Sequence, residues 1–229
     1  MSTLNYLLVF ILAYLIGSFP TGVLMGKIFF HEDIRNFGSG NIGTTNSFRV
    51  MGPVAGSVVL IIDVLKGTLA TDLPLIFHLR GPKYLLLIAG ACAILGHTFS
   101  IFLKFKGGKA VATSAGVFLG YNLKFFGLCA VVFLPMLFIT SYVSLSSLVS
   151  IVIIFICSFW FHDIFLTIIT GIMMILLFVR HRSNIKRLIN HEENIVPFGL
   201  WYWYKKSHGL LNRKSKINSK NKRLLKLML

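Results

Sequence analysis

Acidic residues are scarce in this chain, which has seven Asp and Glu residues against 23 Lys and Arg among 229 residues. They form no Asp cluster of the kind that holds Mg²⁺ for phosphotransfer to a lipid head group, which argues against that class of enzyme. Cysteine is scarce too: Cys92, Cys129 and Cys157 lie apart in apolar runs, with no CxxC pair and no Cys/His spacing typical of a zinc site. We therefore expect no bound metal and no cofactor.

Charged residues as a whole are few, and apolar residues take their place. They make up 13% of the chain, against 55% hydrophobic residues and a mean hydropathy of +0.78, whereas a soluble domain carries about 25% charge. Because a helical span needs about 20 residues, we expect an all-α polytopic membrane protein, a seven-transmembrane-helix bundle. The expected spans are Leu4–Met25, which we take as a retained helix rather than a signal peptide, 53–77, 84–102, 109–121, 125–141, 144–160 and 162–180.

The basic residues divide unequally between the two sides of such a bundle. With seven spans, nineteen Lys and Arg residues fall on one side and three on the other, while Lys66 lies within a span. Positive charge marks the cytoplasmic side of a membrane protein. The N-terminus is therefore predicted to lie outside, and the polar loops on the basic side are predicted to be cytoplasmic.

The chain is expected to have two parts, a membrane domain over residues 1–193 and a basic cytoplasmic tail over residues 194–229 that begins with aromatic residues. The formal charge of +16 would suggest nucleic acid only if the membrane topology were ignored, so we expect no nucleic-acid partner. Basic residues near a membrane are attracted to anionic lipid by about 1 kcal/mol each, and aromatic residues suit the headgroup zone. We favour a tail that lies on membrane lipids, with a solvated tail as the alternative.

The stretch GSGNIGTTNSFR (residues 38–49) is the first of three polar motifs. Glycine lets the backbone approach a ligand closely, and the amides and hydroxyls between the glycines can surround an anion. Arg49 could hold a phosphate through two parallel hydrogen bonds. The stretch lacks the Gly-Lys-Ser/Thr ending of a P-loop and the strand–helix context of a dinucleotide turn, and a flexible polar loop remains the alternative. Its candidate site residues are Gly38, Ser39, Gly40, Asn41, Gly43, Thr45, Asn46 and Arg49.

The second motif, GHTFSIFLKFKGGKAVAT (residues 96–113), places Gly107 and Gly108 before Lys109, where a helix is expected to begin. A cation at a helix N-terminus opposes the helix dipole unless an anion compensates. Phosphate binding explains this arrangement better than packing does.

The third motif, RHRSNIKRL (residues 180–188), follows the last expected span. His181 and Asn184 lie three residues apart on one helical face, and Arg187 continues the stripe. A solvated basic face is the alternative. Ser144 and Ser147 share a face at the start of the sixth span on the same side, and Glu193 follows the motif. In the second span, Asp63 and Lys66 are three residues apart, and we favour a structural ion pair there.

Together, the three motifs closely resemble those of the bacterial acyl-phosphate:glycerol-3-phosphate acyltransferase family (PlsY), in the same order and at similar spacing over residues 4–193. The resemblance implies a seven-helix enzyme of the bacterial inner membrane that transfers a fatty acyl group from acyl phosphate to the sn-1 hydroxyl of glycerol 3-phosphate. Lysophosphatidic acid and phosphate would result, as the first step of phospholipid synthesis, without metal or cofactor and downstream of an enzyme that makes acyl phosphate. It places Ser39, Arg49, Lys109, His181 and Asn184 as catalytic residues, and Gly38, Gly40, Asn41, Gly43, Thr45, Asn46, Gly107, Gly108, Ser144, Ser147 and Glu193 in substrate binding.

The chain departs from the family pattern at three positions. Ser100 stands where proline is usual, Ala110 where glycine is usual, and His191 where glycine is frequent. Because alanine favours helix, we expect activity to persist with Ala110 at the start of its helix. The main alternative function is a transporter or channel for an organic phosphate, which a cationic pocket in a bundle would also serve. The clustering of the charged motifs on one side argues against it.

Overall fold

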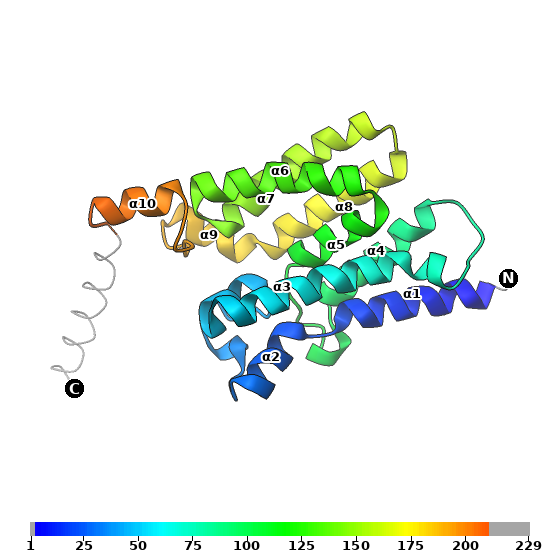
Figure 1. Cartoon of the computed structure of the whole chain (residues 1–229), viewed down its shortest axis with the longest axis horizontal. Helices are drawn as coiled ribbons and strands as arrows, with labels where there is room; N and C mark the ends of the chain where they lie inside the picture. Colours follow the sequence, from blue (N-terminus) through cyan, green and yellow to red (C-terminus); the bar gives the residue numbers. More distant parts are fainter. Residues whose placement is uncertain (1–2, 211–229) are drawn as a thin grey trace.

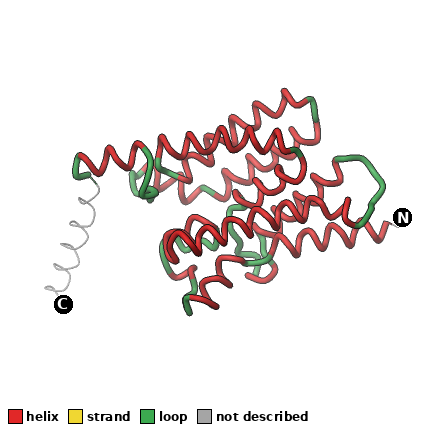
Figure 2. Tube along the Cα trace, viewed as in Figure 1, coloured by secondary structure: helices red, strands yellow, loops and turns green. Residues whose placement is uncertain are grey.

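The protein is built from helices joined by short loops, and the part of the chain that the structure describes contains no strand (Figure 2). A computed structural model describes residues 3–210, and it confirms the predicted all-α class. The helices are α1 (Thr3–Ser18), α2 (Thr21–Phe29), α3 (Thr44–Ile76), α4 (Tyr84–Thr98), α5 (Val111–Tyr121), α6 (Leu123–Thr140), α7 (Val143–Ser158), α8 (Ile164–Arg180), α9 (Arg182–Ile189) and α10 (Leu200–Ser207), with 3₁₀ turns at Ile34–Asn36, Ile101–Leu103 and Phe159–Phe161.

Four helices are long and apolar enough to cross a membrane, namely α3, α4 with its 3₁₀ turn, α6, and α7 with its turn. Two bent pairs add two spans if each pair counts as one: α1 with α2 bends by 45°, and α8 with α9 by 59°. Length and apolarity thus support up to six spans in the described residues, against the seven expected. The difference is α5, whose 11 residues reach only about 17 Å across a hydrocarbon core of about 30 Å.

The short helix α5 lies inside the bundle. Its residues Thr113, Val117 and Phe118 are buried, and it packs most extensively against α3. A Cβ on Gly116 would lie 1.9 Å from the carbonyl oxygen of Val64, and one on Gly67 would lie 2.2 Å from that of Thr113. Small residues that bring two backbones this close are the usual means of packing helices in membranes.

The outside of the bundle is apolar and its inside holds polar groups. Val131 on α6 is 70% exposed and Ile175 on α8 is 64% exposed, while His97 and Asn184 are buried. Large apolar surfaces left open in this way mark a membrane or partner interface. The distribution agrees with a bundle whose side faces lipid.

Helix α3 is interrupted at Gly52, whose φ of 85° and ψ of 179° are not helical. Pro53 follows, and a proline disfavours helical backbone at the residue before it. The predicted span 53–77 matches the part of α3 after this break. The part before it carries Arg49 and tilts the end of the first motif away from the membrane-spanning segment.

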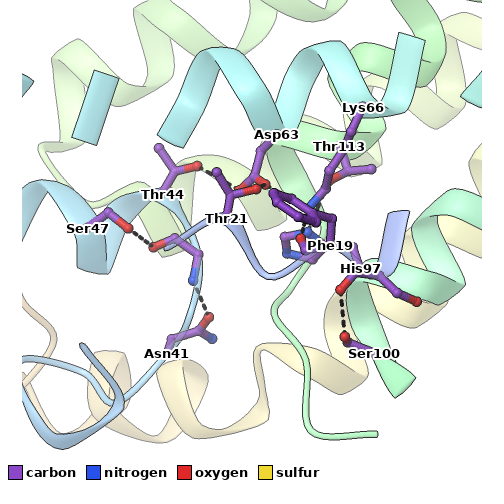
Figure 3. A network of polar contacts seen from close by, with 12 residues as sticks. Phe19, Thr21, Asn41, Thr44, Ser47, Asp63, Lys66, His97, Ser100 and Thr113 are labelled. Carbon is purple, nitrogen blue, oxygen red and sulfur yellow. Dashed lines mark hydrogen bonds and ion pairs between the residues drawn. The ribbon is translucent and has the colours of Figure 1, made fainter. Parts of the chain in front are cut away.

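The bend between α1 and α2 surrounds a buried ion pair (Figure 3). Lys66 Nζ lies 2.7 Å from Asp63 Oδ1 and also donates to the carbonyl oxygen of Phe19 at 3.0 Å. The Thr21 hydroxyl donates to Asp63 at 3.0 Å, and that of Thr44 at 3.4 Å. The predicted pair is therefore confirmed, and it joins α3 to the bend and to the end of the first motif.

Candidate active site

The first motif is shaped by an asparagine that points into its own loop. Asn46 is buried, its Nδ2 donates to the carbonyl oxygens of Ile34 at 2.9 Å and Phe37 at 3.2 Å, and its Oδ1 accepts from the Ser39 amide at 2.8 Å. Gly38 has a φ of +61°, and a Cβ there would lie 2.2 Å from Asn46 Oδ1. The loop therefore needs glycine at Gly38 and holds the exposed Ser39 in a fixed place.

The remaining residues of the first motif lead into α3. Asn41 Oδ1 accepts from the Gly43 amide at 3.0 Å, and Gly43 is the residue that precedes the first turn of α3. Thr45 lies half-buried in that turn, and Arg49 one turn later is exposed. Gly40 has a φ of +70°, which completes the turn of the loop.

The second motif forms a loop held from two sides. The amides of Gly107 and Gly108 donate to the carbonyl oxygens of Thr98 at 3.1 Å and His97 at 3.0 Å. Their own carbonyl oxygens accept from Arg180, at 2.7 Å for Gly107 and 3.2 Å for Gly108. The two amides are thus used within the protein. The glycines position Lys109 rather than offering their N–H groups to a ligand.

Helix α5 begins later than expected. Lys109 was predicted at the first turn of a helix, but α5 starts at Val111 and Ala110 has a φ of +58°, in the left-handed region that favours glycine. The local preference of alanine for helix is overridden because Gly108 and Lys109 are held by α4, α8 and α9. Lys109 therefore stands before the helix, in the loop.

The second and third motifs meet at one hydrogen-bonded network. Lys109 Nζ donates to Asn184 Oδ1, and Asn184 Nδ2 donates to the Ser144 hydroxyl at 2.7 Å and to Glu193 Oε1 at 2.9 Å. Ser144 also donates to Glu193 at 2.8 Å, while Arg187 Nε lies 2.7 Å from Glu193 Oε2. Residues from three separate segments, α7, α9 and the segment after α9, are thereby fixed around the ammonium group of Lys109.

Charge in this region is strongly positive. Burial lowers the pKa of Lys109 from its usual 10.5 to about 8, and the charges of Arg187, Arg180 and Arg49 lower it too, whereas Glu193 raises it. Arg49 also interacts electrostatically with Glu193 and Arg187, which places the first motif within range of the other two. A site with this surplus of cations favours an anionic ligand.

His181 lies at the bend between α8 and α9, and its ring is buried. Its Nδ1 is 2.9 Å from the carbonyl oxygen of Leu177, and because a carbonyl only accepts, Nδ1 carries a hydrogen. Burial and the charge of Lys109 lower the pKa of His181 to about 4, so at neutral pH the ring is uncharged and Nε2 keeps its lone pair. The expected shared face of His181 and Asn184 is modified by the 59° bend, yet both lie close enough to Lys109 to interact with it.

Ser147 differs from what its spacing indicates. Ser147 shares a face with Ser144, but its hydroxyl donates to the carbonyl oxygen of Val143 in its own helix at 2.8 Å. Two further residues have contacts that the sequence does not predict. Arg180 binds the carbonyl oxygens of the glycine loop, and Nδ1 of His97 lies 3.2 Å from the Thr113 hydroxyl. The only signal in the sequence is that Arg180 belongs to the third motif and His97 to the second.

Within residues 3–210, no group of three or more His, Cys, Asp or Glu side chains is arranged to hold a metal ion. The positive charge of the site comes from lysine and arginine side chains near Glu193. The fold and the site together define a class of protein. It is a helical membrane protein with a cationic, polar site at one end of its bundle, built from two glycine-containing loops and a short helix.

The sequence of the chain narrows that class to one family. The family model described as "Glycerol-3-phosphate acyltransferase" matches residues 7–191, so the chain belongs to this family. The chain is 94% identical over 222 residues to "Glycerol-3-phosphate acyltransferase 2" of Lactobacillus johnsonii, covering 97% of this chain and 100% of that protein. It is 65% identical over 208 residues to the protein of the same name from Lactobacillus acidophilus, covering 91% of this chain and 98% of that one.

Solved structures agree with this assignment. The glycerol 3-phosphate form of PlsY (YgiH), an integral membrane glycerol 3-phosphate acyltransferase, superposes with a TM-score of 0.77 at 32% identity, over 84% of this chain and 96% of that one. The lysophosphatidic acid form of PlsY gives a TM-score of 0.74 at 30% identity, over 83% and 95%.

Proposed function

We propose that the protein transfers a fatty acyl group from acyl phosphate to the sn-1 hydroxyl of glycerol 3-phosphate, giving lysophosphatidic acid and phosphate as the first step of phospholipid synthesis. The observation that carries the proposal is the network around Lys109, in which Asn184, Ser144, Glu193 and Arg187 fix one partly buried ammonium group. Its surroundings suit a phosphate monoester. The similar solved structures of PlsY are its glycerol 3-phosphate form and its lysophosphatidic acid form, which supports the choice of acceptor and product.

The reaction needs no covalent intermediate on the protein. The sn-1 hydroxyl oxygen bonds to the acyl carbonyl carbon, the bond from that carbon to the phosphate oxygen breaks, and inorganic phosphate leaves. An acyl phosphate is a mixed anhydride and already activated, so an activated serine is not required. The hydroxyl proton goes to the departing phosphate, with Nε2 of His181 as the less favoured acceptor.

We assign Lys109 and Arg49 to neutralising the phosphates during this step, because groups that meet developing charge in a preorganised site lower the barrier. Ser39, His181 and Asn184 complete the catalytic set. We assign substrate binding to residues that shape the two loops or belong to the network, namely Gly38, Gly40, Asn41, Gly43, Thr45, Asn46, Gly107, Gly108, Ser144 and Glu193. We also assign it to Ser147, which lies on the same helix as Ser144.

We further propose that the protein crosses the bacterial inner membrane seven times, with α5 as a short fourth pass, the N-terminus outside and the site in the cytoplasm. The excess of basic residues on the side of the site supports this orientation. A cytoplasmic site would receive acyl phosphate from a separate enzyme that makes it.

The test is product formation by purified protein given palmitoyl phosphate and glycerol 3-phosphate with EDTA present, beside Lys109→Ala. We expect lysophosphatidic acid and phosphate in equal amounts from the wild type, and at least a hundredfold less from the variant, in line with the loss of one charge-stabilising group. Lys124→Ala, which removes an exposed lysine at the end of α6 opposite to α10, is the matched control. Near-normal turnover by Lys109→Ala would overturn the role of that lysine, and well-folded wild type without product would favour the phosphate transporter.

A further inference from the structure

The segment after the third motif is fixed to the end of α6 and the start of α7. The Val196 amide donates to the Ser141 carbonyl oxygen at 2.9 Å, and the Tyr202 amide donates to the Ser141 hydroxyl at 3.0 Å. Gly199 has a φ of +95°, and a Cβ there would lie 2.4 Å from the Phe138 carbonyl oxygen. Helix α10 therefore has a defined seat, although the family model ends at residue 191.

The exposed surface of α10 is aromatic. Trp201 is 38% exposed, Trp203 50% and Tyr204 49%. Trp201 and Tyr204 share a helical face and stack with ring centroids 5.3 Å apart, whereas Trp203 projects toward another side of the helix. Three large rings left open on an eight-residue helix indicate a surface that binds something apolar.

This aromatic surface continues the lipid-facing side of the bundle. Trp203 packs edge-to-face on Phe138 with ring centroids 5.7 Å apart. Phe138 itself is exposed on the last turn of α6, beside the exposed Ile139 and one turn beyond Leu134. Because α6 ends at Thr140, the rings of α10 lie at the level where a membrane-spanning helix leaves the hydrocarbon. Figure 1 shows α10 at this end of α6.

Positive charge accompanies the rings. Lys205 Nζ donates to the Tyr142 hydroxyl at 3.2 Å and lies over the Trp201 ring at 5.2 Å, and Lys206 beside it is exposed. The sequence from residue 194 onward has nine Lys and Arg residues and no Asp or Glu. A protein surface that binds α10 would need acidic groups at the membrane boundary, whereas anionic lipid supplies them there in any case.

We propose that α10 is a membrane anchor whose Trp201, Trp203 and Tyr204 lie in the headgroup zone of the bilayer, with anionic lipid phosphates against Lys205 and Lys206. Trp and Tyr rings prefer this zone because one part of each ring system is apolar and another part is polar. The anchor also holds the loop segment 194–199, which leads back to Glu193. Helix α10 thereby fixes the height of the site relative to the membrane.

The test uses tryptophan fluorescence of the full chain in bicelles, which expose both membrane faces to one solution. The protein has three tryptophans, so Trp160→Phe with Trp201→Phe leaves Trp203 as the only emitter, and Trp160→Phe with Trp203→Phe leaves Trp201. We expect lipid with bromine near the top of the acyl chain to remove most of the emission, and aqueous iodide to remove little. Anionic lipid is expected to shift the emission to the blue, and Lys206→Gln to reduce that shift.

Lys124→Gln, a matched loss of an exposed lysine at the other end of α6, is expected to leave the shift unchanged. Strong quenching by iodide without quenching by brominated lipid would overturn the proposal, because α10 would then stand in water. Protection from both quenchers would overturn it as well, since a second copy or another protein would then cover this surface. Lysophosphatidic acid formation by each variant, measured alongside, reports separately on the proposed function.

Discussion

The carboxylate of Glu193 raises the pKa of Lys109, against the larger effect of burial, which lowers it. Because burial and three arginines lower the pKa of Lys109 to about 8, the ammonium form predominates below that pH and is lost above it. A phosphate needs the ammonium form. We expect kcat/KM for glycerol 3-phosphate to fall as pH rises through about 8, since kcat/KM reports groups of the free enzyme.

Two substitutions that shift the pKa of Lys109 in opposite directions test this prediction more sharply. Glu193→Gln removes the charge that raises the pKa of Lys109 and should move the alkaline fall to lower pH. Arg180→Gln removes a charge that lowers it and should move the fall to higher pH, besides loosening the glycine loop. Arg182→Gln is the control, because Arg182 is an exposed cation two residues after Arg180 and is not among the charges that shift the pKa of Lys109. We expect the alkaline fall to keep its position in this variant and to move in the other two. Equal profiles in all four proteins would contradict the assignment.

The backbone explains the three departures from the family pattern. Ala110 and His191 have φ values of +58° and +57°, which is why glycine is usual at such positions. Ser100 has a φ of −66°, the value that proline fixes, and its hydroxyl donates to the Ser18 carbonyl oxygen at 2.6 Å. At all three positions the backbone of this chain therefore has a φ value that the residue usual in the family would adopt easily.

Ala110→Gly should therefore stabilise the protein. In the folded protein, a non-glycine residue in the left-handed region costs about 1–2 kcal/mol, and glycine removes this cost. Glycine also makes the unfolded chain more flexible, which lowers the stability of the fold by about 0.4–1 kcal/mol. We expect a net gain of about 0.5–1 kcal/mol in the free energy of unfolding, measured by denaturation in mixed micelles, with activity retained. Ala112→Gly, which lies inside α5, should lose stability instead. A loss in both variants would argue that Ala110 is not strained.

Among the helices, the contact between α3 and α5 depends on glycines that bring two backbones together. The side of α5 that faces α3 carries Gly116, and the side of α3 that faces α5 carries Gly67. Because α5 is too short to span the bilayer alone, its place is set by this contact and by α4 and α6. The loop with Lys109 leads directly into α5, so the contact also holds the site.

Gly116→Ala should be strongly destabilising, because the added methyl group would lie 1.9 Å from a backbone carbonyl that cannot move without shifting α3. We expect a loss of at least 1–3 kcal/mol, as for other overpacked cores. Gly127→Ala on α6 is the control, since a Cβ there meets nothing within 4 Å. It should be neutral or slightly stabilising by helix propensity. Thermal unfolding in detergent, followed by loss of activity, compares the two.

The sequence predicts the helices of this bundle better than it predicts their partners. Apolar runs locate α3, α4, α6, α7 and α8 within several residues, because the bilayer imposes length and composition on each segment separately. The inward turn of Asn46 and the left-handed Ala110 depend on neighbours far along the chain, which no local pattern specifies. Charge and spacing indicated Lys109, Asn184 and Ser144, and the structure brings these three together, but the grip of Arg180 on two carbonyl oxygens left no trace in composition.

Over the whole molecule, the two ends of the described chain lie at opposite ends of the bundle, with the start of α1 at one and α10 at the other (Figure 1). An odd number of passes follows if both ends reach water. We expect a cysteine at Lys206 in a cysteine-free background to resist a membrane-impermeant thiol reagent in intact cells. A cysteine at Lys124 should react. The reverse pattern would invert the orientation, and labelling of both would mean an even number of passes between Lys124 and Lys206.

The pairing of Asp63 with Lys66 also bears on how the protein enters the membrane. An aspartate and a lysine at the centre of a span each oppose insertion by about 2.5–3.5 kcal/mol when they stand alone. Their spacing of one helical turn lets opposite charges cancel within α3 itself, before α1, α2 or α5 has packed against it. The segment can then leave the insertion machinery as an electrically neutral helix, so biogenesis does not have to wait for the tertiary contacts that later bury the pair.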